Sequence, residues 1–528
     1  MTRESADRDS GDRDLLVRIL RQAQRTPEAP ALTSAASGYT RTYGEVVRDA
    51  RDIAARISGV TAPGERVILV SDDEPETYVG LVAAALAGVV PAIVAAASPA
   101  AALVDCATAV GAGAVIIRDG LRRPGLSLPT VTVPTATAPA GTRTAAGTVT
   151  MDGVSASPDA PLLMLFTSGT TGRPKSVVLP RRALHAIPDI LREHKLSWID
   201  WHPGEMIYTP LPAAHIGGVW WILNGLVSGC HCVTGHDPGS SLSGILRRWR
   251  IASVCMVPTL LGRLASELRA GTDGSLRDLR LVVYGGSRAD DGDVGTVEES
   301  GARTAQIFGL SETGCTALCL PTAPGSLDRI RAGQVGRPYP GVSLRVIANP
   351  AETPVNCGVS DTEGTLWIRT PGAMLGYHDN PGATAATLVD GWVNTGDRVT
   401  VDDDGYVTLR GRVSELIICG GSNVMPDDVD RIATSVAGVQ DAAAFEIPDR
   451  RFGAVVGLAV IPEEDAPEGS ARGRALKRTV AAEFRDRAEP ESRPVRITIV
   501  DHIPRTASGK VRRGELRSAL VDAREGAQ

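Results

Sequence analysis

Leu165-Phe-Thr-Ser-Gly-Thr-Thr-Gly-Arg-Pro-Lys175 is the stretch of sequence that decides the fold class. It continues an apolar run, residues 162–166, which predicts a buried strand. From Thr167 to Lys175 there are four hydroxyl side chains, two glycines and one lysine. Glycine lets backbone N–H groups approach phosphate oxygens, and hydroxyls donate hydrogen bonds. The stretch therefore predicts an anion-binding loop behind a strand, and its spacing does not fit a Walker A loop.

Lysine is scarce in this chain. It occurs only at Lys175, Lys195, Lys477 and Lys510, and arginine supplies the other basic residues. Arginine serves as well as lysine on a solvated surface, whereas lysine brings a compact, mobile point charge to one atom. Lys175 and Lys510 both end glycine-containing loops, so we interpret these two as functional. The expected phosphate ligands of the first loop are Thr167, Ser168, Gly169, Thr170, Thr171, Gly172 and Lys175.

Short apolar runs alternate with helical segments around this loop. The runs that predict strands are residues 66–71, 89–94, 114–117, 162–166, 206–209, 253–257 and 281–284. Residues 15–58 have a largely helical pattern, and another helix is expected from about Glu74. This alternation predicts an α/β fold with parallel sheets that are covered on both faces. Residues 120–160 are rich in Pro, Thr, Ala and Gly, and are expected to form an irregular surface connection.

The pattern changes in the last third of the chain. From about residue 332 to 407, short β runs are separated by Gly, Pro and Asp, which predicts a small β-barrel-like subdomain. The tail after Gly411 is expected to be α+β, with helices at 427–437 and 475–487, strands at 442–447 and 456–461, and Gly438 as a helix C-cap. We therefore expect a large N-terminal domain, residues 1–411, and a small mobile C-terminal domain, residues 412–528.

Charge and hydropathy limit the classes of function. The formal net charge is −6 and no basic run could follow a phosphate backbone, so nucleic acid is not an expected partner. The polar, charged N-terminus does not have the pattern of a signal peptide. The apolar stretch 78–97 is interrupted by Gly88 and Pro91, which favours a buried helix followed by a parallel strand. We expect a cytoplasmic protein without a transmembrane segment.

The eight cysteines are scattered, which is typical of buried free thiols in a reducing cytosol. Cys230-His231-Cys232 has no second ligand pair at zinc spacing, so we interpret it as a strand with core sulfur. Cys315 and Cys319 are expected to lie one helical turn apart, also as core residues.

The phosphate loop resembles that of the adenylate-forming superfamily, which includes acyl-CoA synthetases, non-ribosomal peptide adenylation domains and luciferases. The resemblance continues in family order through residues 210–218, 284–287, 308–313, 392–397, 411–412, 415–426 and 504–510. Because these blocks keep their order along nearly the whole chain, the resemblance is specific. It implies an AMP-binding N-terminal domain, a C-terminal lid that carries the catalytic lysine, and the activity of an acyl-CoA synthetase-like ligase.

The resemblance also implies a role for each block. The implied catalytic residues are Lys510, His215, which would line the acyl pocket, and Glu312, which would bind Mg²⁺ together with Thr167. Ser311 would join the phosphate ligands, and the adenosine would contact Gly285, Gly286, Ser287, Phe308, Asp397 and Arg412. Gly420 and Gly421 would form the loop that meets the acceptor thiol, and Ser414 stands near the hinge.

These residue types suit the implied chemistry. A carboxylate is a poor nucleophile that must approach a polyphosphate of like charge, and Lys510 can neutralise both in the transition state. Mg²⁺ on Glu312 would bridge phosphate oxygens, and Asp397 can accept hydrogen bonds from two ribose hydroxyls. Structural alternatives stay open: a core histidine at 215, a turn carboxylate at 397, a helix-terminal carboxylate at 312, a surface ion pair at 412 and an ordinary loop lysine at 510.

Some positions depart from the family pattern. Ser176 stands where glycine is usual, and Phe308 replaces a more common tyrosine, which keeps ring stacking but removes a hydroxyl. Ser311 keeps the hydroxyl of a frequent threonine. Ser414 lies near the position where the family usually has a hinge Asp or Lys, which leaves the details of the domain rotation open.

The segment Ala213-Ala214-His215 bears on the substrate. It lacks the aspartate with which amino-acid-activating members pair the substrate amine, and a buried ammonium without a partner is costly. We therefore do not expect an α-amino acid. Trp220 and Trp221 follow closely, and they either wall the acyl pocket or belong to the core.

The sequence thus predicts a ligase that uses ATP and Mg²⁺ to convert a carboxylic acid into its acyl-adenylate and passes the acyl group to a thiol, with CoA as the preferred co-substrate. The alternative acceptors are the pantetheine of a carrier protein, an amine or another small nucleophile. A nucleotide-binding module without catalysis is disfavoured because Lys175, Glu312 and Lys510 are all present. A Rossmann dehydrogenase is disfavoured because Gly111-Ala-Gly113 is not followed by the third glycine of that motif. A serine hydrolase is disfavoured because the sequence contains no G-x-S-x-G motif. A homodimer is one assembly open to such a chain.

Overall fold

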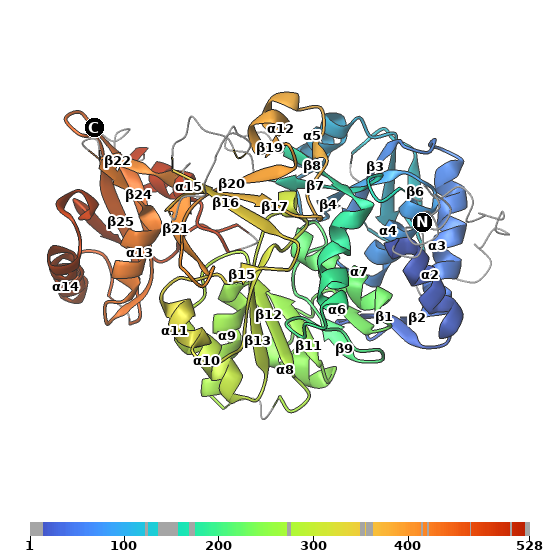
Figure 1. The fold of residues 1–528 in the computed structure, drawn as a ribbon, viewed down its shortest axis with the longest axis horizontal. Helices are drawn as coiled ribbons and strands as arrows, with labels where there is room; N and C mark the ends of the chain where they lie inside the picture. The colour runs from blue at the N-terminus through green and yellow to red at the C-terminus, as the bar shows by residue number, and fades with distance from the viewer. Residues whose placement is uncertain are drawn as a thin grey trace. The chain divides into compact units, whose positions relative to one another are not determined.

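The computed structural model describes residues 14–121, 125–135, 157–167, 175–271, 276–348, 354, 363–412, 415–419, 422–464, 466–506 and 509–522. The chain forms two compact units: residues 1–344 with 368–394, and residues 345–367 with 395–528. Figure 1 shows the elements of each unit. A large unit with parallel sheets and a smaller α+β unit confirm the expected mixed α/β fold. The domain boundary expected after residue 411 stays a prediction.

One sheet of the larger unit has the strand order β15-β14-β13-β12-β11-β9-β10-β1-β2. Its strands are β1 (Pro30–Ser34), β2 (Thr40–Thr42), β9 (Met206–Tyr208), β10 (His231–Thr234), β11 (Ser253–Met256), β12 (Leu281–Gly285), β13 (Arg303–Phe308), β14 (Leu318–Pro321) and β15 (Arg337–Pro338). The strands from β1 to β13 in this order pair in parallel. Antiparallel strands close the two edges. The carboxyl ends of the parallel strands therefore lie along one edge of the sheet.

The second sheet of this unit has the order β18-β8-β7-β4-β3-β5-β6. Its strands are β3 (Arg66–Ser71), β4 (Val90–Ala95), β5 (Ala114–Arg118), β6 (Thr130–Val133), β7 (Pro161–Thr167), β8 (Lys175–Pro180) and β18 (Gly376–Tyr377). Helix α4 (Pro75–Leu86) is buried along its whole length and packs on strands of both sheets. This packing confirms the interpretation of residues 78–97 as a buried helix followed by a parallel strand. Within the described residues, no helix is long and apolar enough to span a membrane.

The remaining helices of the larger unit cover the sheets. They are α2 (Leu15–Arg25), α3 (Tyr43–Ser58), α5 (Ala100–Val110), α6 (Ala186–Glu193), α7 (Ile216–Val227), α8 (Leu242–Arg248), α9 (Pro258–Arg269), α10 (Asp291–Glu299), α11 (Ser326–Arg331) and α12 (Pro381–Thr387), with the 3₁₀ turns η3 (Arg181–Leu184) and η4 (Ser311–Thr313). The local sequence determines where several of these helices begin. Thr42 and Glu45 form a reciprocal capping box at α3, and the Asp14 carboxylate accepts from two backbone N–H groups at the start of α2.

Two expectations about local structure are wrong, and one is incomplete. Residues 15–58 are largely helical in α2 and α3, but β1 and β2 separate these helices and complete the nine-stranded sheet. Residues 120–160 are not wholly irregular, because β6 pairs with β5, while residues 136–156 lie outside the described part. Cys315 and Cys319 do not share a helix: Cys315 has a φ of 95° in the turn after Gly314, and Cys319 belongs to β14.

The expectation of buried free thiols is confirmed for the cysteines in the described part of the chain. Cys230 and Cys232 flank His231 at the start of β10, and both sulfurs are in the core. The His231 Nε2 atom lies 2.6 Å from the Thr33 hydroxyl, so a local polar contact accounts for this histidine.

A further sheet contains β16 (Ser343–Ile347), β17 (Glu363–Arg369), β19 (Leu388–Val389), β20 (Trp392–Val401) and β21 (Val407–Arg412). The chain passes between the two units within β16, β17 and β20. The β-rich texture predicted for residues 332–407 is thus confirmed.

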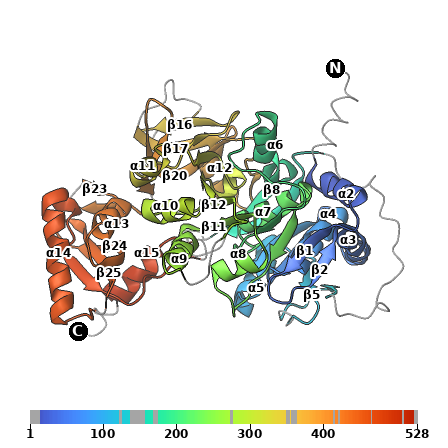
Figure 2. The same cartoon turned by 90° about the horizontal axis from the view of Figure 1, so that it is seen from below.

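The smaller unit also contains the C-terminal sheet of β22 (Ile417–Cys419), β23 (Ser422–Val424), β24 (Val439–Asp449), β25 (Gly453–Pro462) and β26 (Arg496–Ile499). Helices α13 (Pro426–Thr434) and α14 (Ala471–Arg487) pack on one face, where Val480 and Phe484 are buried. Helix α15 (Arg513–Arg517) covers the other face through Leu516. Figure 2 shows α14 and α15 on opposite sides of β24 and β25. The predicted helices and strands are confirmed, except that α13 is capped by Ser435 and Gly438 instead turns the chain into β24.

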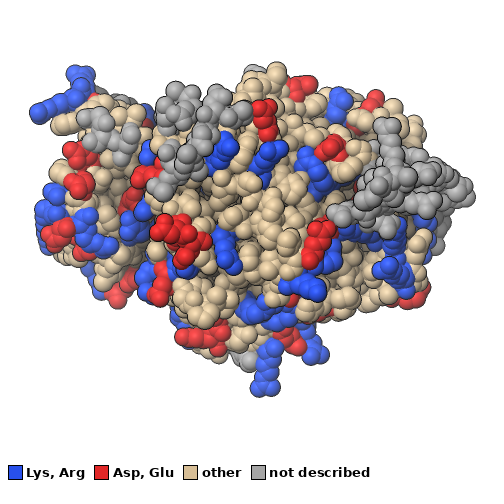
Figure 3. All heavy atoms as spheres, in the orientation of Figure 1, with Lys and Arg blue, Asp and Glu red and all other residues tan. Residues whose placement is uncertain are grey.

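Charged residues of both signs are intermixed on the face drawn in Figure 3, as the near balance of acidic and basic residues in the sequence predicts.

A buried ion network joins α2 to α6. The Asp189 carboxylate accepts two hydrogen bonds from Arg18, at 2.6 and 3.0 Å, and lies 2.9 Å from His185 Nδ1. Burial alone would raise the pKa of Asp189, but the contacts with His185 and Arg18 lower it below its usual range. The ionised carboxylate is therefore part of the native packing.

We predict that Asp189→Asn lowers the free energy of unfolding by about 3–5 kcal/mol at pH 7, because it leaves the largely buried Arg18 guanidinium without its carboxylate partner. A carboxylate with a lowered native pKa stabilises the fold above its unfolded pKa near 4, and this contribution is lost as the pH falls. The advantage of the wild type should therefore shrink below about pH 4.

Urea denaturation followed by tryptophan fluorescence at a series of pH values measures both effects. Asp328→Asn is the matched control, because Asp328 pairs with Arg331 on the exposed surface, where such pairs contribute about 1 kcal/mol or less. Equal losses in the two variants would contradict the prediction.

Candidate active site in two parts

The expected phosphate loop connects two antiparallel strands. Thr167 ends β7, Lys175 begins β8, and the two residues are directly paired. The Thr167 hydroxyl lies 3.4 Å from the Lys175 carbonyl oxygen. The expected ligands Ser168, Gly169, Thr170, Thr171 and Gly172 lie outside the described residues. A strand–loop–strand hairpin differs from the strand–loop–helix of a Walker A site, which agrees with the spacing argument.

Two expected adenine contacts lie at the ends of neighbouring parallel strands. Gly285 ends β12 and pairs with Ile307 of β13, and Phe308 ends β13. A Cβ on Gly285 would lie 2.3 Å from the Ile307 carbonyl oxygen, so only glycine fits this close approach. Gly286 has a φ of 96° and turns the chain toward Ser287. The structure thus brings both expected contact segments to the carboxyl edge of the sheet, where α/β proteins commonly bind ligands.

Glu312 and Lys175 are brought together by a tyrosine. Glu312 lies with Ser311 in the turn η4, and its Oε1 accepts a hydrogen bond of 2.7 Å from the Tyr377 hydroxyl. The Lys175 Nζ atom lies 5.2 Å from the centroid of the same Tyr377 ring, a cation–π distance. The sequence motifs did not identify Tyr377, because its partners lie 65 and 202 residues away along the chain.

The chemistry of Glu312 fits a magnesium ion. In the described structure the Tyr377 hydroxyl donates to Oε1 of its carboxylate. A hard carboxylate oxygen is a ligand that Mg²⁺ prefers, and Mg²⁺ commonly combines one or two carboxylates with substrate phosphates. No cluster of three or more His, Cys, Asp or Glu side chains suited to a metal occurs in the described residues, so a cation here would take its other ligands from substrate and water.

His215 has a local structural role. It caps α7, and its Nδ1 atom accepts a hydrogen bond of 3.3 Å from the Gly217 N–H. The segment follows β9, so His215 belongs to loops at the same carboxyl edge as the ends of β12 and β13. Trp220 and Trp221 are fully buried and pack with Trp201, with centroid distances of 5.3 and 5.1 Å. Their burial supports the core alternative for both tryptophans.

The smaller unit holds the expected ribose contacts. Asp397 of β20 and Arg412 of β21 are directly paired, and the Arg412 Nε atom donates a hydrogen bond of 3.0 Å to Asp397 Oδ1. The other oxygen, Oδ2, is buried and has no hydrogen-bond partner in the part of the chain that the structure describes. Burial raises the pKa of Asp397, and the charges of Arg412 and Lys510 counter part of that shift. An unpartnered buried acceptor suits a ligand that brings its own hydroxyl donors.

Hydrogen bonds fix the ends of the Lys510 loop. The Lys510 N–H donates to the Thr506 hydroxyl at 3.1 Å, and the Thr506 N–H donates to the Lys510 carbonyl at 2.8 Å. Arg505 donates to the Gly509 carbonyl at 2.8 Å and to both oxygens of Asp441 at 2.9 and 2.7 Å. Sequence analysis did not identify Arg505 as a residue that holds the Lys510 loop, because a single arginine does not stand out in an arginine-rich chain.

Arg513 is a second support that the motifs did not identify. Its guanidinium bonds Glu415 at 2.9 Å, Asp430 at 2.8 Å and the Ala444 carbonyl at 2.8 Å. It thereby ties the segment after Lys510 to the start of β22 and to α13. Ser414, Gly420 and Gly421, the expected hinge and acceptor-loop residues, lie outside the described residues, so their roles stay predictions.

Two family models match this chain. The family model for AMP-binding enzymes matches residues 19–378, and the model for the C-terminal domain of AMP-binding enzymes matches residues 428–510. The medium/long-chain-fatty-acid–[acyl-carrier-protein] ligase FadD10 of Mycobacterium tuberculosis is 45% identical over 96% of this chain and 95% of its own. The fatty acid–[acyl-carrier-protein] ligase MmaC of Mycobacterium marinum is 44% identical over 97% and 98%.

A solved structure shares the fold. O-succinylbenzoate coenzyme A synthetase from Bacillus subtilis, in complex with ATP and magnesium ion, has a TM-score of 0.78 at 22% identity, covering 95% of this chain and 99% of that chain.

We predict that Asp397→Ala weakens ATP binding by about ten- to a hundredfold, because hydrogen bonds to a charged group contribute about 1.5–3 kcal/mol. The loss should nearly vanish for 2′,3′-dideoxyATP, which lacks the hydroxyl donors. Isothermal titration of both nucleotides into both proteins measures the difference. The same loss for the two nucleotides would show that Asp397 does not accept from the ribose.

We predict that Arg505→Ala slows acyl-adenylate formation by about ten- to a hundredfold, because a less rigid loop would displace the Lys510 ammonium from its catalytic position. The dissociation constant of ATP should not change. Arg512→Ala is the control, since Arg512 pairs with Glu515 on the exposed surface two residues beyond Lys510. ATP–pyrophosphate exchange gives the rate, and equal rates for the two variants would contradict a positioning role for Arg505.

Proposed function

The chain belongs to the AMP-binding enzyme family, and we propose that it joins a medium- or long-chain fatty acid to the thiol of an acyl carrier protein. Membership confirms the resemblance to the adenylate-forming superfamily, and the ligase relatives identify the protein as an AMP-forming acid–thiol ligase. The observation that carries the finer proposal is the 45% and 44% identity to two fatty acid–[acyl-carrier-protein] ligases over nearly the whole chain.

The relatives favour the carrier-protein alternative over CoA, the acceptor preferred on sequence grounds. A carrier protein and CoA present the same pantetheine thiol, so the adenylation chemistry is common to both acceptors. The acyl group would leave AMP as the thiol sulfur bonds to the carbonyl carbon. Gly420 and Gly421 are proposed to meet that thiol, and Ser414 to lie near the hinge.

The motif residues are proposed to act on ATP. Lys175, Thr167 and Ser311 would hold the phosphates, and Asp397 and Arg412 the ribose. Glu312 would hold Mg²⁺, which when bound supplies positive charge against the polyphosphate. Lys510 would place its ammonium against the acid carboxylate and the α-phosphate as the new acyl–phosphate bond forms and pyrophosphate leaves.

An apolar acid suits the composition around His215. Helix α7, which His215 caps, has the sequence IGGVWWILNGLV, and all but its last residue are buried. No aspartate stands in the Ala213-Ala214-His215 segment to pair with an amine. ATP and carrier proteins occur in the cytoplasm, which we propose as the site of action. That compartment also agrees with the free buried cysteines.

We predict that kcat/KM for ATP–pyrophosphate exchange rises about fourfold for each added CH₂ of the fatty acid, since burying one CH₂ contributes about 0.8 kcal/mol, until the chain fills its pocket. With the preferred acid, thioester formation should be at least ~100-fold more efficient with holo acyl carrier protein than with CoA. The measurement is a paired assay of both acceptors at several concentrations.

Apo carrier protein and the Lys510→Ala variant are the controls for that assay. Apo carrier protein has no thiol arm and should accept nothing, and Lys510→Ala should bind ATP but form no adenylate. Equal or better transfer to CoA would overturn the choice of acceptor. Exchange that is independent of chain length would overturn the choice of acid.

A further inference from the structure

Tyr377 lies on a short strand that is fixed on two sides. Strand β18 pairs antiparallel with β8, so that Tyr377 faces Val177, two residues beyond Lys175. The Leu375 N–H donates to the Val178 carbonyl, and the His378 N–H donates to the Ser176 carbonyl at 2.8 Å. The Met374 N–H donates to the Glu312 carbonyl at 2.9 Å. This backbone therefore connects the strand that begins at Lys175 with the turn that carries Glu312.

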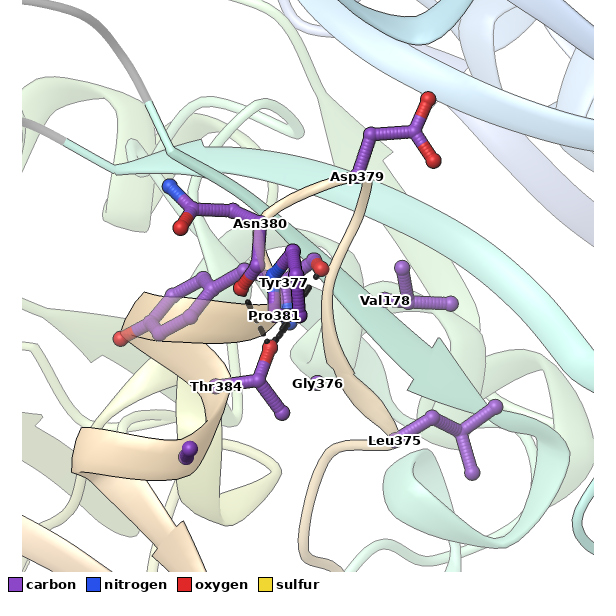
Figure 4. A pocket seen from close by; sticks show the side chains of 9 residues that line it. Val178, Leu375, Gly376, Tyr377, Asp379, Asn380, Pro381 and Thr384 are labelled. Atoms are coloured by element: carbon purple, nitrogen blue, oxygen red, sulfur yellow. Dashed lines mark hydrogen bonds between the residues drawn. The ribbon is translucent and has the colours of Figure 1, made fainter.

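The orientation of the Tyr377 side chain is equally constrained. Its backbone N–H donates to the Thr384 hydroxyl at 2.9 Å, and its side chain is almost wholly buried. Figure 4 shows a surface hollow lined by Val178, Leu375 and Thr384, with the tyrosine hydroxyl pointing away from Leu375 and Val178. On that side the hydroxyl donates to Glu312 Oε1 at 2.7 Å, and the ring lies 5.2 Å from Lys175 Nζ.

These two contacts have different chemistry. The hydrogen bond fixes one carboxylate oxygen of Glu312 and leaves the other for a cation, in the way that outer partners orient the ligands of metal sites. The cation–π contact places the Lys175 ammonium against the face of the ring, and phosphate can approach this ammonium without breaking a hydrogen bond to Tyr377. The rigid side chain of Tyr377 thus orients both the Glu312 carboxylate and the Lys175 ammonium.

We propose that Tyr377 is a positioning residue for the magnesium–nucleotide complex. Tyr377 orients the Glu312 carboxylate toward the metal. Before ATP binds, it also holds the Lys175 ammonium near Glu312. This inference rests on the proposed function, because it uses the assignment of Glu312 to Mg²⁺ and of Lys175 to phosphate.

Tyr377→Phe tests the hydrogen bond alone, because phenylalanine keeps the ring beneath Lys175. The Mg²⁺ concentration for half-maximal ATP–pyrophosphate exchange should rise about ten- to a hundredfold, the usual effect of losing an outer partner of a metal ligand. The rate at saturating Mg²⁺ should stay within about threefold of the wild type. Tyr377→Leu should in addition raise the KM for ATP, since it also removes the ring.

Equilibrium binding gives a readout that does not depend on turnover. Titration of Mn²⁺ into protein with ATP and no acid, followed by electron paramagnetic resonance, should show weaker metal binding in Tyr377→Phe. In the Glu312→Gln background, Tyr377→Phe should cause no further loss, because the two residues act through one contact. Tyr39→Phe is the matched control: Tyr39 lies in the turn between β1 and β2, and no hydrogen bond of its hydroxyl occurs in the described structure.

An unchanged Mg²⁺ dependence in Tyr377→Phe would overturn the inference, and so would a lower rate at saturating Mg²⁺ with the half-maximal concentration unchanged. Additive losses of Mn²⁺ binding in the double variant would overturn it as well. Failure of the wild type to exchange pyrophosphate with any fatty acid would instead reject the proposed function, and the Mn²⁺ titration would still decide the role of Tyr377.

Discussion

Parallel strand pairing is the constraint on which the larger unit depends. Parallel neighbours cannot be joined by a tight hairpin, so the chain returns through a longer crossover, in most cases a helix. Every carboxyl end then emerges along one edge, and the segments after β9, β12 and β13 meet there although they lie far apart in the sequence. The antiparallel β7–β8 hairpin fixes Thr167 and Lys175 opposite one another, at the two ends of the expected phosphate loop.

Glu312 and Asp397 each accept a side-chain hydrogen bond on one carboxylate oxygen, although the two lie in different surroundings. Glu312 receives one neutral donor, the Tyr377 hydroxyl, and Asp397 receives one cationic donor, Arg412. In each case a hydrogen bond fixes one oxygen, and we propose that the other oxygen contacts the ligand. A neutral donor leaves the full charge of Glu312 for the proposed cation. Arg412 instead balances the charge of the deeply buried Asp397, whose proposed ligands are neutral hydroxyls.

The sequence predicts the parts of this protein whose signals are local. The apolar runs at 66–71, 114–117 and 281–284 form strands because consecutive apolar residues allow burial on both faces. The motif glycines follow from backbone sterics, as Gly285 illustrates. The secondary-structure predictions failed where the pairing partner is distant in the sequence. β1 is a strand because it pairs with β10, and the sequence of residues 15–58 contains no signal for that pairing. Tyr377, Arg505 and Arg513 escape sequence reasoning for the same reason, since each is defined by residues brought to it by folding.

The proposed ribose contact of Asp397 would link folding to nucleotide binding. Nucleotide hydroxyls would supply donors to an oxygen that has none among the described residues, and an unmet buried acceptor costs about 1–3 kcal/mol. Bound nucleotide removes the cost and, by mass action, stabilises only the native state. If Asp397 binds the ribose, the resistance of the smaller unit to unfolding and proteolysis should therefore rise with the concentration of ATP or AMP.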